Sequence, residues 1–191
     1  MRVALTGTPG TGKTAVASVL TKKGYKVVHL HRFAQRNNCI VGLDTKRKSQ
    51  LVDIDVLNSC IEQDYPTTDL TLFEGHIGHL LRCIDKIVII RCHPIQLKHR
   101  LQRKKWSVKK IKENVDAEIL DVILCEAVEL HPVDNIFEID TTQKSITEVA
   151  LAIELMIQRN FEPTDAYTIG QIDWSEEILT DRCVKKRYGA R

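Results

Sequence analysis

Paired cysteines and long apolar runs are both missing from this sequence. Its six cysteines show no C-x-x-C pair and no regular spacing, so we expect reduced thiols, several of them in the core. No apolar run approaches the roughly 20 residues of a membrane-spanning helix. A strand-like run begins directly after Met1 and leaves no room there for a secretory segment. We therefore expect a cytoplasmic protein, or a nuclear one in a eukaryote.

A large charge of one sign is also missing, because the formal net charge of the 191 residues is only +3. The hydrophobic share of 43% and the charged share of 28% are those of an ordinary globular protein. The whole molecule is therefore not an obvious nucleic-acid binder. Two local segments, Lys98–Lys112 and Arg182–Arg191, are rich in Lys and Arg. Such segments can meet phosphates or RNA, although a solvated helix face is the commoner explanation.

The most informative segment is Gly7–Thr14, which reads GTPGTGKT and fits the phosphate-binding loop pattern G-x-x-x-x-G-K-[ST]. A strand-like run precedes it and helix-forming residues follow it, so backbone N–H groups and the positive end of a helix dipole would point at one polyphosphate. Lys13 would reach the β- and γ-phosphates, and the Thr14 hydroxyl would ligate Mg²⁺. Kinases, GTPases and ATPases share this loop. The N/T-K-x-D sequence with which GTPases read guanine is absent from the chain.

Strand and helix patterns alternate along the chain, which predicts an α/β fold with a parallel sheet and a ligand beyond the carboxyl ends of its strands. The expected strands are residues 2–6, 26–29, 70–74, 86–91 and 135–140. The expected helices are 15–20, one from Pro94, one from Ser107 through Ile123, and one after a capping box at Ser145 and Glu148. Residues 31–66 predict two further helices, broken near Gly42. From Asn160 the pattern fades, and the aromatic residues of this tail argue for packing on the core or on a partner.

A carboxylate that holds Mg²⁺ is expected at the end of a strand beside the phosphate loop, where Glu74 stands. Gly75 would let the backbone turn sharply, so that both Glu74 and His76 reach the phosphates. His76 is as well explained by loop packing as by such a contact, and both interpretations stay open. His76 and His79 have the spacing of two ligands on one helix face, but a zinc site is disfavoured because the sequence supplies no third ligand. Four other residues are interpreted as structural or as exposed helical acids, namely His29, His31, Asp53 and Asp55.

A cluster of cations lies between two expected helices and is followed by Trp106; its members are Arg100, Arg103, Lys104 and Lys105. Phosphoryl transfer spreads negative charge over the migrating group, and a mobile basic lid would stabilise this charge and expel water. Arginine suits that role because its planar guanidinium binds phosphate oxygens bidentately. The alternative is a solvent-facing amphipathic hairpin.

These segments together resemble a known family. The loop GTPGTGK, the strand that ends in an acidic-x-His motif, the run IIRCHPIQLKHRLQRKKW and the segment KKIKENVDAEILDVILCEA are similar to the adenylate-kinase-like ribosome-assembly factors. This family comprises the nuclear adenylate kinase isoform six and its archaeal counterparts. The resemblance implies a three-layer P-loop nucleoside monophosphate kinase fold with a five-stranded parallel sheet and a short lid. It places the kinase domain at residues 1–159 and a C-terminal extension at 160–191.

The resemblance also assigns site residues. Those matching the ATP loop are Gly10, Gly12, Lys13, Thr14 and Ala15. Residues 103–113 match the lid, with Arg103 or Lys104 at its phosphate-contacting position, and residues 30–53 match the monophosphate-binding region. Arg32 and Arg36 are both candidates for the arginine that holds the monophosphate, and Thr142, Gln143 and Lys144 match the loop that would touch adenine. The chain departs from the family pattern at Glu74, where Asp is usual, at His31-Arg32-Phe33 and at Lys104-Lys105-Trp106. These departures are expected to affect the affinity and specificity for the acceptor more than they affect ATP binding.

The implied activity is an adenylate kinase that uses Mg²⁺ and transfers a phosphoryl group from ATP to AMP. Lys13 and Arg103 or Lys104 would stabilise the transferring phosphate, Thr14 and Glu74 would organise Mg²⁺, and His76 would orient the acceptor or water. The resemblance further implies ATPase activity and a role in small ribosomal subunit assembly and rRNA maturation, with the eleventh small-subunit ribosomal protein and the pre-ribosomal small subunit as partners. We expect a monomer with no membrane partner. A purely metabolic adenylate kinase and an ATP-gated assembly chaperone stay open as alternatives.

Overall fold

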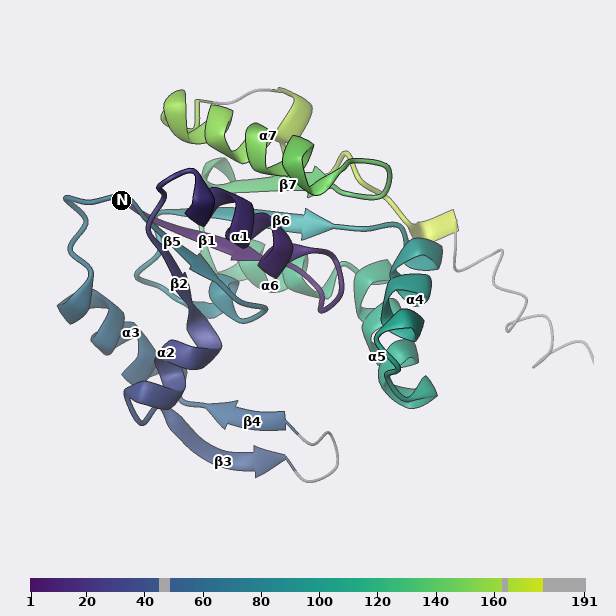
Figure 1. Ribbon diagram of the computed structural model, residues 1–191, viewed down its shortest axis with the longest axis horizontal. Helices are drawn as coiled ribbons and strands as arrows, with labels where there is room; N and C mark the ends of the chain where they lie inside the picture. Colours follow the sequence, from purple (N-terminus) through teal and green to yellow (C-terminus); the bar gives the residue numbers. More distant parts are fainter. Residues whose placement is uncertain (45–48, 163–164, 177–191) are drawn as a thin grey trace, which may run out of the picture.

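A central sheet of five parallel strands organises the chain (Figure 1), in the computed structural model that describes residues 1–44, 49–162 and 165–176. The strand order is β2-β5-β1-β6-β7, and every neighbouring pair is parallel. The strands are β1 Arg2–Thr6, β2 Val27–His29, β5 Thr71–Glu74, β6 Lys86–Arg91 and β7 Ile136–Asp140. This arrangement confirms the predicted α/β fold with its five-stranded parallel sheet.

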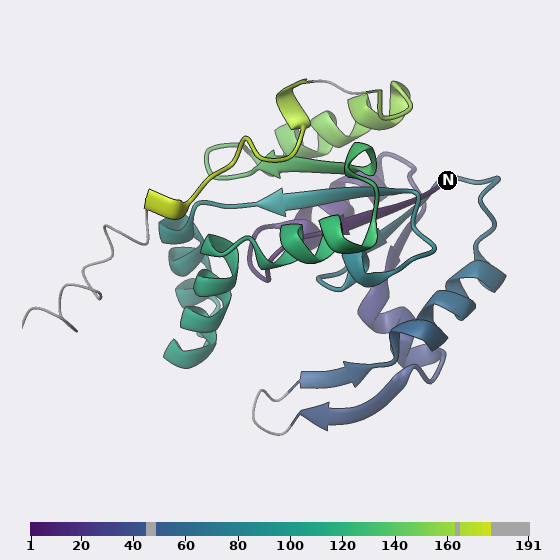
Figure 2. The ribbon, with the colours of Figure 1, turned by 180° about the vertical axis from the view of Figure 1, so that it is seen from behind.

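Helices cover both faces of the sheet and give three layers. On one face, α1 (Lys13–Lys22) and α7 (Ile146–Gln158) pack over one core cluster that includes Val3 and Leu5. On the other, α2 (Leu30–Arg36), α3 (Ile54–Asp64) and α6 (Val122–Leu130) pack over a second cluster that includes Ala4. Alternate side chains of a strand point to opposite faces, so one strand serves both clusters. Helix α1 lies in front of the sheet in Figure 1, and α6 lies in front when the molecule is seen from behind in Figure 2.

The predicted pair of helices in residues 31–66 is wrong in its middle part. Between α2 and α3 the chain forms an antiparallel hairpin of β3 (Ile40–Asp44) and β4 (Ser49–Val52). Exposed Val41 and Leu43 alternate with half-buried neighbours, which is the period of a half-buried strand rather than of a helix. The strand has only five residues, and so short a run does not distinguish the two-residue period of a strand from the period of a helix. Together with α2, the hairpin projects from one end of the sheet in Figure 1.

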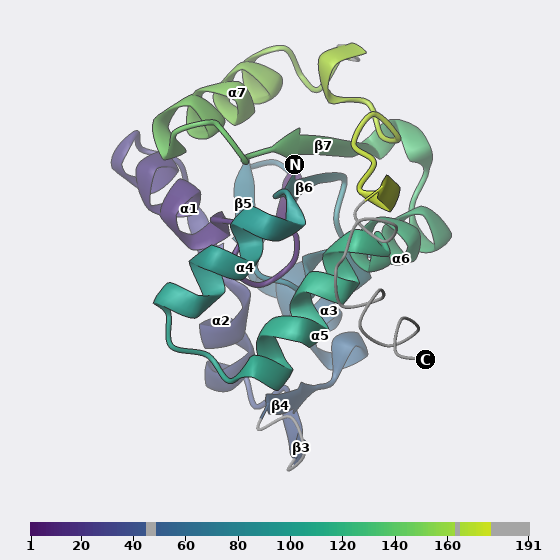
Figure 3. The ribbon, with the colours of Figure 1, turned by 90° about the vertical axis from the view of Figure 1, so that its right-hand side faces the viewer.

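The single long helix expected from Ser107 is also wrong, because the chain breaks it into α5 (Val108–Ile119) and α6. Asp121 separates the two helices with a left-handed backbone φ of 52°, a conformation that Asp tolerates better than most side chains. Helix α4 (Pro94–Arg103) packs antiparallel to α5 through a small apolar cluster that includes Leu101 and Ile111. We call α4 and α5 the lid hairpin; Figure 3 shows its two helices side by side.

The described part of the tail packs on the core. Thr168 forms an isolated antiparallel bridge with Phe137 on the edge strand β7, and the Trp174 ring lies 4.9 Å from the His93 ring at the start of α4. The basic segment Arg182–Arg191 lies outside the described residues. Within the described ranges, no helix is both long enough and apolar enough to cross a membrane.

Candidate active site

The loop between β1 and α1 requires glycine at two positions for different reasons. Gly7 has φ +136°, and a Cβ there would lie 2.3 Å from the carbonyl oxygen of Ile90 on β6. Gly10 has φ +103°, and its Cβ would meet the side chains of Leu97 and Leu101 on α4 within 3 Å. Both backbone values lie in the region that glycine adopts most readily. The loop is therefore pressed between β6 and the lid hairpin, and its shape is fixed by neighbours far away in the sequence.

Lys13 lies at the centre of this loop, with only 7% of its surface exposed. Its Nζ donates hydrogen bonds to the carbonyl oxygens of Gly7, at 2.6 Å, and Thr8, at 3.0 Å. Burial lowers the pKa of Lys13 from 10.5 to about 8, although the negative charges of Glu74 and Glu118 oppose that shift. Burial thus disfavours the charged form of Lys13, and a bound anion would stabilise that form.

Thr14, Glu74 and His29 form a connected set at the mouth of the loop. The Thr14 hydroxyl donates to Glu74 Oε1 at 3.0 Å, and His29 Nδ1 lies 2.7 Å from Glu74 Oε2. The set arises because β2, β5 and β1 are neighbours, with His29 paired directly opposite Glu74. His29, interpreted as structural from the sequence, is therefore a site residue that sequence reasoning missed; its only signal was its place at the end of a strand.

The set fits Mg²⁺, because a hydroxyl and a carboxylate oxygen meet where the loop opens, and Mg²⁺ prefers oxygen ligands while keeping several waters and substrate phosphates.

Among the described residues no group of three His, Cys, Asp or Glu side chains could hold a metal ion. His76 and His79 do not act together, since His79 is buried against Thr6 Oγ1 (3.2 Å) and Glu126 Oε2 (2.7 Å). The disfavoured zinc site therefore gains no support.

His76 lines the cleft and remains exposed to solvent. Surrounding protein partly desolvates its ring, and this, together with the positive charge of Lys13, lowers the pKa of His76 to about 4. The Glu74 carboxylate opposes the shift but does not overcome it. The ring is therefore neutral near pH 7 and can exchange hydrogen bonds without contributing a charge.

One cleft of about 930 Å³ joins these groups to the lid hairpin and to the loop after β7. It contains most of the site residues predicted from the sequence: Gly10, Gly12, Lys13, Thr14, Ala15, Glu74, His76, Arg103 and Lys104. Three predicted residues do not line it. Arg32 and Arg36 are exposed on α2, whereas Gln143 borders a separate, smaller cavity with Trp174. The same loop instead presents Thr141 and Lys144 to the cleft.

Arg100 ties the loop after β7 to the phosphate loop. Its Nη1 donates to the Thr11 carbonyl oxygen at 3.0 Å, and its Nη2 donates to the Thr141 carbonyl oxygen at 2.8 Å. The Thr141 hydroxyl donates to the same Thr11 oxygen at 3.0 Å. Sequence reasoning placed Arg100 in a mobile lid, but these bonds fix it to the body of the protein.

The cleft is electrostatically uneven. All the lysines and arginines that line it come from the phosphate loop, the lid hairpin and the loop after β7: Lys13, Arg100, Arg103, Lys104 and Lys144. On the side of α2 and β5, the described lining residues with polar side chains are His31, Glu74 and His76. One half of the cleft therefore suits a polyphosphate, and the other presents a carboxylate and two imidazoles.

Comparison with known proteins places this site in a family. Residues 3–121 match the family described as AAA domain. A protein of Archaeoglobus fulgidus named "Putative adenylate kinase" is 40% identical over 178 residues, which cover 93% of this chain and 94% of the relative. A protein of the same name from Pyrococcus abyssi is 37% identical over 177 residues, which cover 92% of each chain. Among solved structures, the shikimate kinase of Acinetobacter baumannii in complex with shikimate has a TM-score of 0.57 at 18% identity, covering 83% of this chain and 93% of that one. At that identity the likeness concerns the fold alone.

Proposed function

Since this chain belongs to the family of the archaeal proteins named putative adenylate kinases, we propose that it is an adenylate kinase that transfers the γ-phosphoryl group of Mg·ATP to AMP. The observation that carries this proposal is the meeting of Lys13, Thr14 and Glu74 at the mouth of a glycine-bent loop. A buried cation and an adjacent pair of oxygen ligands are what a metal-bound triphosphate needs.

In this mechanism Lys13 exchanges the carbonyl oxygens of Gly7 and Thr8 for oxygens of the β- and γ-phosphates. Arg103 and Lys104 approach the same phosphates from the lid hairpin and offset the charge that spreads during transfer. Thr14 and Glu74 would hold Mg²⁺, which when bound neutralises phosphate charge and aligns the phosphates. His29 keeps the Glu74 carboxylate in place through its 2.7 Å hydrogen bond.

His76 acts in this proposal as a neutral hydrogen-bonding group that orients the acceptor. A protonated imidazole would bind the phosphate of AMP as a cation, but the pKa of about 4 leaves the His76 ring of the free protein neutral near pH 7. Arg32 or Arg36 holds that phosphate instead. Both lie on α2 outside the cleft, so the proposal requires α2 and the hairpin to move toward the cleft when AMP binds. Gln143 contacts adenine only if the loop after β7 turns, since Lys144 and Thr141 face the cleft now.

The test resolves the nucleotide products formed from Mg·ATP with and without each nucleoside monophosphate. Two ADP per ATP, formed only with AMP, would establish the proposed activity, and the Lys13→Ala protein should lose it. Unchanged turnover in the Lys13→Ala protein would refute the assignment of the site. ADP and free phosphate in amounts indifferent to AMP would instead establish ATP hydrolysis, in which water takes the place of the acceptor beside His76.

A role in small ribosomal subunit assembly is the second proposed function, with ATP hydrolysis as its driving step. One observation favours a large anionic or acidic partner: the exposed tip of the lid hairpin, which includes the end of α4 and the start of α5, carries Arg103, Lys104, Lys105 and Lys109. The test measures capture of the eleventh small-subunit ribosomal protein by this chain with ATP, with ADP and with no nucleotide. Capture that changes between ATP and ADP supports an ATP-gated chaperone. Equal capture in all three states would argue against gating by ATP, and absent capture supports a purely metabolic kinase.

A further inference from the structure

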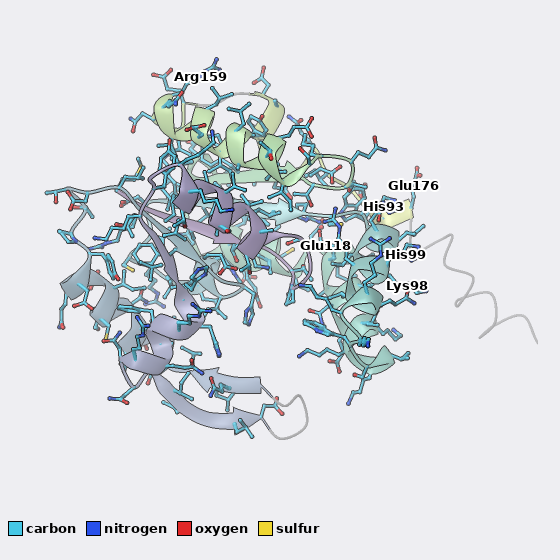
Figure 4. The ribbon with its side chains drawn as sticks, in the orientation of Figure 1. His93, Lys98, His99, Glu118, Arg159 and Glu176 are labelled. Atoms are coloured by element: carbon cyan, nitrogen blue, oxygen red, sulfur yellow. The ribbon has the colours of Figure 1, made fainter. Side chains whose placement is uncertain are left out.

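A buried carboxylate from the lid hairpin reaches the phosphate loop. Glu118, near the end of α5, is 2% exposed. It accepts hydrogen bonds from the Thr8 hydroxyl, from Arg91 Nε at 2.9 Å, and from the backbone N–H of Cys92 at 3.0 Å. In Figure 4 Glu118 lies beside the carboxyl ends of the central strands, at the root of the lid hairpin. One side chain therefore connects α5, the end of β6 and the phosphate loop.

Charge balance alone does not explain Glu118. The guanidinium of Arg91 also donates to Glu138 and to Asp121, so three carboxylates surround one cation. Two of these, Glu118 and Glu138, are almost fully buried. A further negative charge beside a loop that binds a polyphosphate weakens that binding electrostatically. The contact with Thr8 is what distinguishes Glu118 from Glu138.

The Thr8 residue that Glu118 holds is central to the geometry of the loop. The Thr8 carbonyl oxygen accepts from Lys13 Nζ at 3.0 Å, from the Thr11 hydroxyl at 3.0 Å and from the Thr11 N–H at 3.2 Å. The orientation of this peptide group sets where the Lys13 ammonium lies before ATP binds. Because the Thr8 side chain is 3% exposed and bonded to Glu118, the peptide cannot turn without breaking a buried hydrogen bond to a charged group.

We propose that Glu118 is a positioning residue for the phosphate loop: through the Thr8 hydroxyl it fixes the Thr8 peptide that orients Lys13, and it joins the lid hairpin to the loop. This role rests on the proposed function, since it concerns Mg·ATP binding at the same site. The lid hairpin and the phosphate loop then move as one unit at their base, and only the part of the hairpin beyond Leu101 and Ile111 is free to close.

The experiment measures the dissociation constant of a non-hydrolysable Mg·ATP analogue and the melting temperature for a set of variants. Thr8→Val keeps the shape of the side chain and removes only the hydroxyl; it should raise the dissociation constant about tenfold, the loss of a hydrogen bond to a charged group. Thr8→Ser restores the hydroxyl and should stay within about twofold of the unaltered protein. Glu118→Ala should weaken binding, but no more than Thr8→Val does, because it also removes a negative charge that opposes the polyphosphate. The double variant should be no more than about twofold weaker than Thr8→Val alone, because both changes break the same bond.

Glu138→Ala is the matched control. Glu138 is as buried as Glu118 and binds the same guanidinium, but its other partner is the backbone N–H of Gly170, at 2.9 Å, rather than the loop. The Glu138→Ala variant should have a lower melting temperature and an unchanged dissociation constant for the Mg·ATP analogue. Equal weakening by Glu138→Ala and Glu118→Ala, or an unchanged dissociation constant in Thr8→Val, would overturn the positioning role. Absence of binding by the unaltered protein would overturn the proposed function itself, and the positioning role with it.

Discussion

The charge of Lys13 should limit activity at mildly alkaline pH, and this is the sharpest consequence of its burial. A lysine in water keeps its proton to well above pH 10, but the pKa of Lys13 is lowered from 10.5 to about 8 by burial. A phosphate loop binds ATP through the ammonium form. The free protein therefore loses its binding-competent form as the pH rises through about 8.

The size of the effect follows from the shift. Because burial lowers the pKa of Lys13 from 10.5 to about 8, the site disfavours the ammonium form by about 3 kcal/mol relative to water. Bound phosphates reverse this by adding negative charge, so the pKa of Lys13 rises again in the complex. Because kcat/KM reports groups of the free enzyme and kcat reports groups of the complex, kcat/KM for ATP should fall about tenfold per pH unit above pH about 8, while kcat falls only at higher pH.

The assay determines both parameters for ATP between about pH 7 and 9.5, with the acceptor saturating. Lys13→Arg is the control, since a guanidinium keeps its charge across this range; whatever activity it retains should not fall near pH 8. The stability of the free protein should change in the opposite sense. Between about 8 and 10.5 the unfolded chain binds the Lys13 proton more tightly than the folded one, so this residue adds to the free energy of unfolding as the pH rises. A kcat/KM that stays level to pH 9.5 would refute the burial argument.

Four further outcomes concern the site, the residues that support it and one exposed ion pair. His29→Ala should lower turnover about tenfold with little change in melting temperature, because it removes one hydrogen bond to Glu74, while His29→Asn, which keeps a donor, should lower turnover less. Arg91→Met removes the cation shared by two buried carboxylates and should cost about 3–5 kcal/mol, or roughly 6–20 °C in melting temperature. The cost should be smaller at pH about 5 than at pH about 8, because burial raises the pKa of Glu138 and that carboxyl then takes up a proton on folding. Lys112→Ala, in an exposed ion pair, should cost under about 0.5 kcal/mol by the same measurement. His76→Gln should lower kcat, yet its pH profile of kcat/KM should be parallel to that of the unaltered protein between about pH 5.5 and 7.5, since His76 of the free protein is already neutral there; a difference in shape would contradict a pKa of about 4.

The central part of the site could be predicted from the sequence because it is local. Lys13 and Thr14 belong to one continuous motif, and Glu74 was found because a strand end is where a parallel sheet presents its ligands. The same logic placed the five strands, whose buried runs carry a clear pattern. The hydrophobic period did not reveal the β3–β4 hairpin or the break at Asp121, because the backbone conformation at each place depends on only a few residues.

The partners of these residues could not be predicted, since they depend on which strands become neighbours. His29 faces Glu74 only because β2 pairs with β5 in one register. Arg91 stands at the end of β6, and its partners Glu118 and Glu138 come from α5 and β7, more than 25 residues later. Neither contact leaves a spacing that a sequence pattern could show.

The uneven cleft bears on the balance between phosphoryl transfer and hydrolysis. The half that would hold ATP is fixed: β6 stands behind Gly7, α4 beside Gly10 and Glu118 beneath Thr8. A triphosphate entering that half orders few additional groups and pays little conformational entropy. The opposite half offers the neutral imidazole of His76, which can orient a water molecule as readily as a phosphate oxygen. The arginines that would favour AMP over water stand outside the cleft on α2. Under the proposed function, kinase activity would therefore depend on how far α2 and its hairpin close on the acceptor, and hydrolysis would be favoured while they remain open.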